Sequence, residues 1–486
     1  MTPIMGFAPD ADPTVAGVLT DCLSLIPYAS GYLAAPSPVA VSAAALAAEC
    51  RGAVVATKLD GSRRLFAGTQ TKLYELSGGT WTDRSAAGSY VGSTESRWSY
   101  CQFGDTSIAS NLADAMQSSA AGSFAAISGA PKAKIVVSAS NNFVIAFNTN
   151  DATFGVSPDR WWNCAQSDQT NWTPSVATGA TTGRLVAREG QITAALPLGD
   201  YIVAYKSRGL FLGSFVGAAN GSWQWPVVPG TECGAVGQEA VCDIGGVHFI
   251  VGEDDFWLFD GTRPQPLTEG ICRDWFRANS SQTFRYRTKC TYDRQRNIVR
   301  IAYPSPGSTG ACDRSLVYHC STKKFGVDNV VQEAALNFIA PGVTIDGLDA
   351  YASTIDALPP IPFDSQYWLS GGRLFAYFDS SHKLVTATGP AGPSMLTTGD
   401  SGDDDSVSAI DRFRVRFARA PLTATATGLV AMNEGEPMLA SGAVCAMNEG
   451  KFDLRQEGRF HRVRLDMTGD LMATGYDIKL KATAGR

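Results

Sequence analysis

Between Leu65 and Thr388 the chain repeats one kind of segment, and this repeat constrains the fold more than any other feature. Each unit holds a short apolar run, a turn, a second apolar or aromatic run, and a polar loop that often carries tryptophan. The units begin roughly 45 to 80 residues apart, which is close to the period of propeller blades. The runs that open them are Leu65–Gly68, Phe143–Ala146, Tyr201–Ala204, Val247–Ile250, Asn297–Arg300 and Gln366–Leu369. The repeat therefore predicts a toroidal, all-β fold.

The first unit shows the plan most clearly. Two apolar runs, Ala53–Ala56 and Arg64–Ala67, flank Asp60-Gly61, and an Asp-Gly pair in this position is a strong hairpin signal. Two further runs follow before Arg84, so one four-stranded blade fits in this stretch. Repeating the count along the chain predicts an irregular β-propeller of about six blades, and a seventh blade is possible around Trp98 to Asn111.

Composition agrees with many short strands. Hydrophobic residues make up 44% of the chain and charged residues only 18%, with 49 glycines and 24 prolines, as expected for strands joined by tight turns. The net charge of −6 is mild for 486 residues, which argues against a protein that reads specific DNA sequences. The 11 cysteines include no C-x-x-C pair, so we expect buried thiols in a reducing compartment.

The domain boundaries follow from changes in pattern. Residues 1–50 are broken up by prolines and predict an extended N-terminal arm, although the Ala-rich piece Val39–Cys50 favours a short helix. Residues 51–400 hold the propeller, and within it 328–363 is too long for an ordinary loop and predicts an inserted projection or interface segment. Residues 401–486 alternate apolar and basic positions and predict a small C-terminal β domain.

The sequence offers no catalytic, cofactor or metal site. The four histidines lie far apart, and neither a nucleophile elbow nor a phosphate-binding loop is found. The acidic clusters Glu253–Asp255 and Asp403–Asp405 lack the alternating spacing of a calcium loop. A sialidase-type turn is matched only in its last half at Gly78–Trp81, where Tyr74 and Leu76 replace the serine and aspartate. We therefore predict a protein that is not an enzyme.

Segments near both ends of the chain resemble a known protein family. The first group of segments is Gly6–Thr14, Gly17–Cys22, Leu25–Tyr28 and Gly31-Tyr32, and the second is Gly450–Phe452, Gly458–Arg462 and Gly475–Ile478. Together they resemble the opening and closing segments of tail nozzle proteins of short-tailed bacteriophages, also called tail hub or DNA stabilisation proteins. The middle of the chain is similar to that family only in its propeller architecture.

The resemblance implies a structural virion protein without a cofactor. Such a subunit belongs to a homohexameric ring below the portal and head-to-tail adaptor, contacts tail fibres or tailspikes, and lines or gates the channel through which genomic DNA passes without sequence preference. It is assembled in the host cytoplasm and located in the phage tail, and no stretch of this chain is apolar enough to span a membrane.

We expect the arm and the C-terminal domain to form the assembly interface, since arginine on alternating strands favours protein contacts. The candidate interface residues are Phe7, Asp10, Asp12, Pro13, Leu25, Pro27, Tyr28, Arg414, Arg416, Arg459, His461 and Arg462. A propeller-fold glycan-binding protein or glycosidase is the alternative, because 46 acidic residues leave room for a catalytic carboxylate pair.

Overall fold

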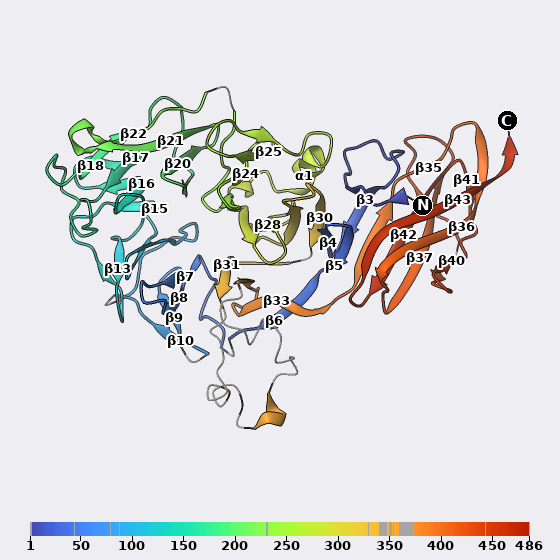
Figure 1. Cartoon of the computed structure of the whole chain (residues 1–486), viewed down its shortest axis with the longest axis horizontal. Coiled ribbons are helices and arrows are strands. Elements are labelled where there is room, and N and C mark those ends of the chain that lie inside the picture. Colours follow the sequence, from blue (N-terminus) through green and yellow to red (C-terminus); the bar gives the residue numbers. More distant parts are fainter. Residues whose placement is uncertain are drawn as a thin grey trace.

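Seven four-stranded antiparallel sheets form a ring in the part of the chain that the structure describes (Figure 1). The structure is a computed structural model, and it describes residues 2–42, 44–77, 79–86, 88–229, 232–328, 330–339, 348, 352, 354–358, 373–442 and 444–485. The first strand of each sheet contacts the first strand of the next, and the seventh sheet contacts the first. The protein is therefore a seven-bladed β-propeller.

The strands of the first four blades follow one another directly along the chain. Blade 1 holds β7 (Ala53–Thr57), β8 (Arg63–Gly68), β9 (Leu73–Ser77) and β10 (Thr80–Asp83), and blade 2 holds β11 (Ser99–Phe103), β12 (Thr106–Ser110), β13 (Gln117–Ser119) and β14 (Ala125–Ala126). Blade 3 holds β15 (Lys132–Ala139), β16 (Phe143–Asp151), β17 (Gly155–Asn163) and β18 (Thr181–Arg184), and blade 4 holds β19 (Ala194–Leu198), β20 (Tyr201–Lys206), β21 (Gly209–Gly217) and β22 (Ser222–Gln224).

The last three blades complete the ring. Blade 5 holds β23 (Val241–Asp243), β24 (His248–Val251), β25 (Phe256–Phe259) and β26 (Gln265–Pro266), and blade 6 holds β27 (Lys289–Asp293), β28 (Ile298–Tyr303), β29 (Arg314–His319) and β30 (Phe325–Asp328). Blade 7 holds β31 (Ala334–Ile339), β32 (Arg373–Phe378), β33 (Leu384–Ala391) and, as its outer strand, β6 (Pro36–Ala40) from near the N-terminus. The ring is thus closed by pairing two segments that are about 350 positions apart in sequence.

The prediction of about six blades was one blade short. The predicted runs within β8, β16, β20, β24 and β28 are mostly buried second strands of their blades, whereas the second strand of blade 2 is the weakly apolar β12. Small side chains such as Ser107 and Ala109 fill that position, so no strong apolar run marks it. The seventh blade that the sequence allowed around Trp98 to Asn111 is blade 2, because β11 and β12 lie in that stretch.

The first hairpin of blade 1 turns at Asp60-Gly61, as predicted. Gly61 adopts φ +83°, a backbone conformation that residues with a Cβ rarely adopt, and the Lys58 N–H donates to the Ser62 carbonyl across the turn. The whole of blade 1 then lies between Ala53 and Asp83, as the sequence indicated.

Both ends of the chain build a β-sandwich beside the propeller, at the right of Figure 1. One sheet holds β4 (Leu25–Tyr28), β5 (Gly31–Ala34), β43 (Met472–Gly485), β36 (Ser406–Arg419) and β40 (Lys451–Phe452), with β1 (Thr2–Pro3) and β41 (Glu457–Gly458) attached. The other holds β2 (Gly6–Phe7), β3 (Val18–Leu23), β34 (Ser394–Thr398), β42 (Phe460–Thr468), β37 (Thr423–Ala431) and β38 (Leu439–Ala440), with β35 (Ser401–Gly402) and β39 (Cys445–Ala446) attached.

The strands between Thr2 and Ala40 pair with the sandwich sheets and with blade 7, so this stretch does not form a separate extended arm. Leu19 and Cys22 of β3 both lie in the sandwich core although they are three positions apart, because the register shift between Leu19 and Asp21 turns both to one face. Pro36 and Pro38 lie in β6, where an outer strand tolerates a missing N–H. The helix favoured at Val39–Cys50 is absent from the residues described there, since β6 occupies the start of that stretch.

The sandwich and the propeller share one hydrophobic core. Tyr32 of β5 is fully buried, accepts a hydrogen bond from the Phe7 N–H at 2.8 Å, and donates to the carbonyl of Phe325 in blade 6. Phe7 packs edge-on against Trp275 of the helix α1 (Arg273–Asn279), with ring centroids 5.1 Å apart. These contacts fix the sandwich against blade 6 and the segment before it.

Part of the predicted insertion belongs to the propeller itself. Ala334, Leu336 and Phe338 alternate inward in β31, the first strand of blade 7, so the segment 328–363 is not wholly a projection. Most of 340–363 and the run Gln366–Leu369 lie outside the described residues. Among the described residues, no helix has the length and apolar character needed to cross a membrane.

Candidate functional site

Charged and amide side chains gather at one end of the propeller axis. Their residues lie just before or at the start of the innermost strand of a blade. Because these strands all enter the ring from the same end, the seven connections that lead into them bring the charged and amide side chains together. We call nine of them the axial network: Glu49, Arg51, Glu95, Arg97, Lys134, Glu239, Arg287, Lys289 and Glu333.

One ion pair in this network crosses the ring. Glu95, from the connection between blades 1 and 2, pairs with Arg287, which lies just before β27 of blade 6. Tyr286 strengthens the bridge by donating its hydroxyl hydrogen to Glu95 Oε2 at 2.8 Å. Partial burial would raise the pKa of Glu95, but the hydrogen bonds from Arg287 and Tyr286 lower it. The bridge therefore stays charged and spans the mouth of the propeller at neutral pH.

The other carboxylates of the network are also held by partners. Glu49 lies 2.9 Å from the Arg51 guanidinium and 3.5 Å from that of Arg97. Glu239 lies 3.9 Å from Lys289 Nζ. Glu333 accepts the Cys50 N–H at 2.8 Å and lies 2.6 Å from His382 Nδ1, while burial raises the pKa of the Glu333 carboxyl. The network links the first and last blades at the seam of the ring.

Lys134, on β15, differs from the other cations of the network. Within the described residues its ammonium group has neither a hydrogen bond nor an ion pair, although the side chain is only partly exposed. Burial lowers the pKa of Lys134. Its backbone carbonyl accepts a hydrogen bond from Gln238 Nε2 at 3.0 Å, which ties blade 3 to the connection before blade 5.

Lys134 lines a cavity of about 330 Å³ at the axial mouth. An adjoining cavity of about 320 Å³ shares Glu95, Arg97, Lys134, Gln191 and Gln238 with it. The walls are therefore polar and carry both charges. Glu95 and Glu239 are the carboxylates in the wall of the first cavity. A general acid needs a raised pKa, and the lowered pKa of Glu95 does not fit that role.

The predicted acidic clusters are held by neighbouring groups. Asp255 is buried and accepts hydrogen bonds from the N–H groups of Phe256 and Thr268 at 2.7 and 2.9 Å. Glu253 and Asp254 lie within 4 Å of Arg208, at 2.8 and 3.7 Å. No group of three or more potential metal ligands is found in the described ranges.

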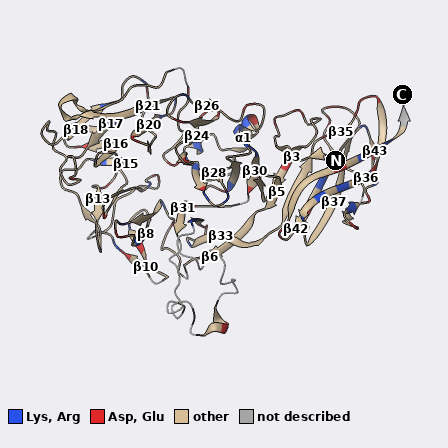
Figure 2. Cartoon of the chain, viewed as in Figure 1, with Lys and Arg blue, Asp and Glu red and all other residues tan. Residues whose placement is uncertain are grey.

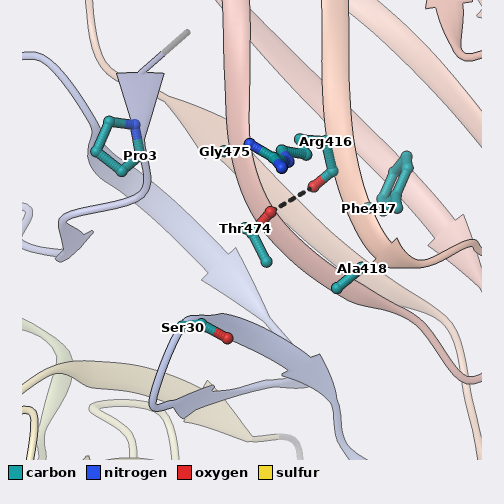
Figure 3. Close-up of a pocket in the computed structure, with 7 residues that line it drawn as sticks. All are labelled: Pro3, Ser30, Arg416, Phe417, Ala418, Thr474 and Gly475. Carbon is teal, nitrogen blue, oxygen red and sulfur yellow. Dashed lines mark hydrogen bonds between the residues drawn. The ribbon is translucent and has the colours of Figure 1, made fainter.

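A shallow groove lies on the sandwich, where β1 ends beside β43 (Figure 3). Its volume is about 490 Å³, and it is lined by Pro3, Ser30, Arg416, Phe417, Ala418, Thr474 and Gly475. Thr474 Oγ1 donates to the Arg416 carbonyl at 3.1 Å. Of the described residues that line the groove, Arg416 alone is charged, and it is one of the predicted interface residues.

Five of the predicted interface residues serve the chain's own interior. Phe7 and Leu25 lie in the shared core, Pro27 is buried in β4, and His461 is fully buried in β42. Asp10 accepts hydrogen bonds from the N–H groups of Asp274 and Trp275, at 2.6 and 2.9 Å, and so caps the start of α1. In this conformation the four buried side chains have little surface to offer another subunit, whereas Asp10 is half-buried.

The remaining predicted residues lie at or near the surface. Asp12, Tyr28, Arg414 and Arg416 are exposed, while Pro13, Arg459 and Arg462 are half-buried. Arg462 pairs with Asp400 within the sandwich.

Arg414 and Arg416 belong to a basic face on the first sandwich sheet, visible around β36 in Figure 2. Alternation points Phe413 and Val415 into the core and leaves the arginines outside. We define the basic face as Arg412, Arg414 and Arg416 of β36, Lys451 and Arg455 beside them, and Lys479 and Lys481 of β43, with the carboxylates Asp411, Asp453, Glu457 and Asp477 interspersed. Cations thus outnumber carboxylates on this face by seven to four.

The axial network was not identified from the sequence. Its members are isolated charged residues in separate connections, and no local motif joins them. The sequence signal that could have identified these residues is their position, since each lies just before or at the start of the first strand of a blade.

Comparisons with known proteins bear on the fold alone. No protein-family model and no curated protein matches the chain. Similar solved structures include BBS1N in complex with ARL6DN, at 8% identity and TM-score 0.41, covering 74% of this chain and 98% of that one. YCF48 bound to D1 peptide is similar at 11% identity and TM-score 0.37, covering 75% and 96%. The computationally designed Ika8 protein is similar at 10% identity and TM-score 0.36, covering 72% and 100%.

Proposed function

We propose that this chain is a structural virion protein, a subunit of the homohexameric tail nozzle of a short-tailed phage. The observation that carries the proposal is the position of the segments that resemble nozzle proteins. Those near the N-terminus contribute β2 to β5, those near the C-terminus contribute β40 to β43, and all of these strands belong to the sandwich. Segments at opposite ends of the sequence thus form one unit, which is the natural place for a shared assembly role.

The basic face supplies a contact surface for that role. Its arginines project from the long strand β36, and arginine suits protein interfaces because its planar group pairs with carboxylates in a fixed geometry. The net charge of the chain is −6, so a neighbouring subunit, or an adaptor of similar net charge, carries acidic surface that the basic face can contact. Contacts of this head-to-tail kind close into a ring when the rotation allows.

The propeller axis itself does not suit the passage of DNA. The Glu95–Arg287 bridge crosses the axial mouth, and the adjacent cavity of about 330 Å³ is far too small for a duplex. In the proposed nozzle the genome therefore runs along the axis of the six-membered ring, and the propellers form its wall. The subunit needs no catalytic group for this task.

Counting copies in purified virions tests the proposal directly. We expect quantitative mass spectrometry to find about six copies per particle, as the proposed homohexameric ring requires. Electron microscopy should place them below the adaptor. Absence of the chain from virions, or cleavage of host polysaccharide by the purified protein, would contradict the proposal.

A matched pair of variants tests the surface. We expect Arg414→Glu combined with Arg416→Glu to prevent incorporation into particles, because it reverses the charge at the centre of the basic face. Arg184→Glu, at an exposed position in blade 3, is the control and should leave incorporation unchanged. If both variants were incorporated equally well, the basic face would not be part of the assembly interface.

A further inference from the structure

The axial cavity contains a surplus cation. Four of the five cations in the axial network are matched by carboxylates: Arg51 and Arg97 approach Glu49, Arg287 pairs with Glu95, and Lys289 approaches Glu239. Lys134 is the fifth, and the described residues offer its ammonium group no hydrogen bond and no ion pair. An unmatched cation in a partly buried site is unfavourable unless an anion accompanies it.

Neutral and charged donors converge beside Lys134. Asn148 Nδ2 donates to Gln191 Oε1 at 3.4 Å, and within the described residues the Gln191 amide nitrogen donates no hydrogen bond. Glu49 lies 3.5 Å from Arg97 Nη1, close enough to balance its charge but beyond the usual hydrogen-bond range, and the described residues offer this buried nitrogen no hydrogen-bond acceptor. Arg97 and Gln191 line the cavity together with Lys134. The two carboxylates in the cavity wall, Glu95 and Glu239, already have cationic partners in Arg287 and Lys289, so they do not neutralise Lys134.

We propose that this cavity is a binding site for a small oxyanion, a carboxylate or phosphate group, with Lys134 as its charge partner and Arg97 and Gln191 as hydrogen-bond donors. Oxyanions accept several hydrogen bonds at once, and charge-assisted bonds of this kind are the strongest that a protein offers. The volume of about 330 Å³ admits a small molecule and not a polymer. The site lies in the propeller and does not depend on the proposed assembly role.

Titration calorimetry on the full chain tests the site, with sodium phosphate in one arm and sodium succinate in the other. Both titrations contain enough sodium chloride to screen exposed charges. We expect saturable binding in at least one arm, and the arm that responds identifies the class of anion. Absence of saturable binding in both arms up to about 10 mM would overturn the proposal.

Three variants separate binding from folding. Lys134→Met should weaken binding by about tenfold or more, the effect of losing one charge-assisted bond. Lys134→Arg should retain binding because it keeps the cation. Lys383→Met, which removes an exposed lysine in blade 7, is the control and should bind as the unaltered chain does.

A stability measurement without added anion adds a second readout. Lys134→Met removes an unmatched cation, so its unfolding midpoint should equal or exceed that of the unaltered chain. A variant that folds normally yet binds with unchanged affinity would overturn the assignment of Lys134.

Discussion

Arg300 shows how one buried residue can hold two blades together. It lies on β28 with no solvent exposure, pairs with Asp328 on β30, and is 3.8 Å from Asp293. Its guanidinium also lies 4.6 Å from the centre of the Phe375 ring in blade 7. The charge cannot reach water, so the two aspartates must remain in place.

We expect Arg300→Met to lower the free energy of unfolding by about 3–5 kcal/mol, because it leaves buried carboxylates without their cation. Arg184→Met is the matched control. Its ion pair with Asp159 is 2.8 Å long and its side chain is 56% exposed, so its loss should lower the free energy of unfolding far less than the loss of Arg300. Urea unfolding measures both values, and equal losses would contradict this account.

Buried histidines make stability depend on pH. Gln456 Nε2 donates to His461 Nδ1 at 2.9 Å and Ser408 Oγ lies 3.1 Å from His461 Nε2, so the ring is held in its neutral form. Burial lowers the pKa of His461, and it also lowers the pKa of His248 and His319. Below about pH 6.5 the unfolded chain therefore binds more protons than the folded one.

This contribution to stability is complete above about pH 6.5 and is lost as the pH falls through the folded-state pKa values. We expect the free energy of unfolding to decrease between pH 7.5 and 5.5, by at most about 1.4 kcal/mol per pH unit for each histidine. His461→Gln should make this slope shallower, measured by urea unfolding at each pH. An unchanged slope in the variant would rule out His461 as a source.

At the scale of elements, α1 depends on a residue that is far away in sequence. Its own N-terminal flanking residue, Cys272, provides no side-chain hydrogen bond, and Asp10 supplies the cap instead. A seven-residue helix is too short to be stable alone. The cap from the N-terminal segment therefore helps to hold α1 against the sandwich.

We expect Asp10→Ala to reduce the free energy of unfolding by about 1 kcal/mol, the usual loss for a helix cap. Asp12→Ala is the control, because within the described residues the Asp12 side chain bonds to the nearby Thr14 alone, at the surface. Hydrogen exchange of the Asp274 and Trp275 amides should rise in the first variant and not in the second. Unchanged exchange at both amides would show that the cap is dispensable.

Across the whole molecule, the sandwich and the propeller form one cooperative unit. Their shared core runs from Val463 and Leu465 of the sandwich to Val299 and Leu316 of blade 6, and Tyr32 lies within it. Two parts that bury apolar surface against each other stabilise each other and unfold together. The strand β6 adds a covalent link, since it leaves the sandwich and closes blade 7.

We expect a single thermal transition when the propeller is followed by tryptophan fluorescence and the sandwich by hydrogen exchange of β37 and β42. Tyr32→Phe removes the donor to Phe325 and leaves the Phe7 amide without its acceptor, at a cost of about 1–3 kcal/mol. Both probes should shift together in this variant. Two separate transitions in the unaltered chain would contradict the coupling.

The sequence by itself determined the all-β class and the plan of the blades. Those conclusions rest on local signals, such as the Asp60-Gly61 turn and the alternation in β36, and local signals depend only on neighbouring residues. The same signals gave blade 2 only as a possible seventh blade, because Ile108 is the single large apolar side chain of β12.

Only the tertiary structure decided which distant segments meet. Blade 7 closes with β6, the sandwich joins both ends of the chain, and Glu95 reaches Arg287 across the ring. No pattern around Lys134 marks it as a cation without a partner, since that property depends on which of seven connections surround it. Pairing over hundreds of residues is selected by the free energy of the whole fold, and a single sequence carries no local trace of it.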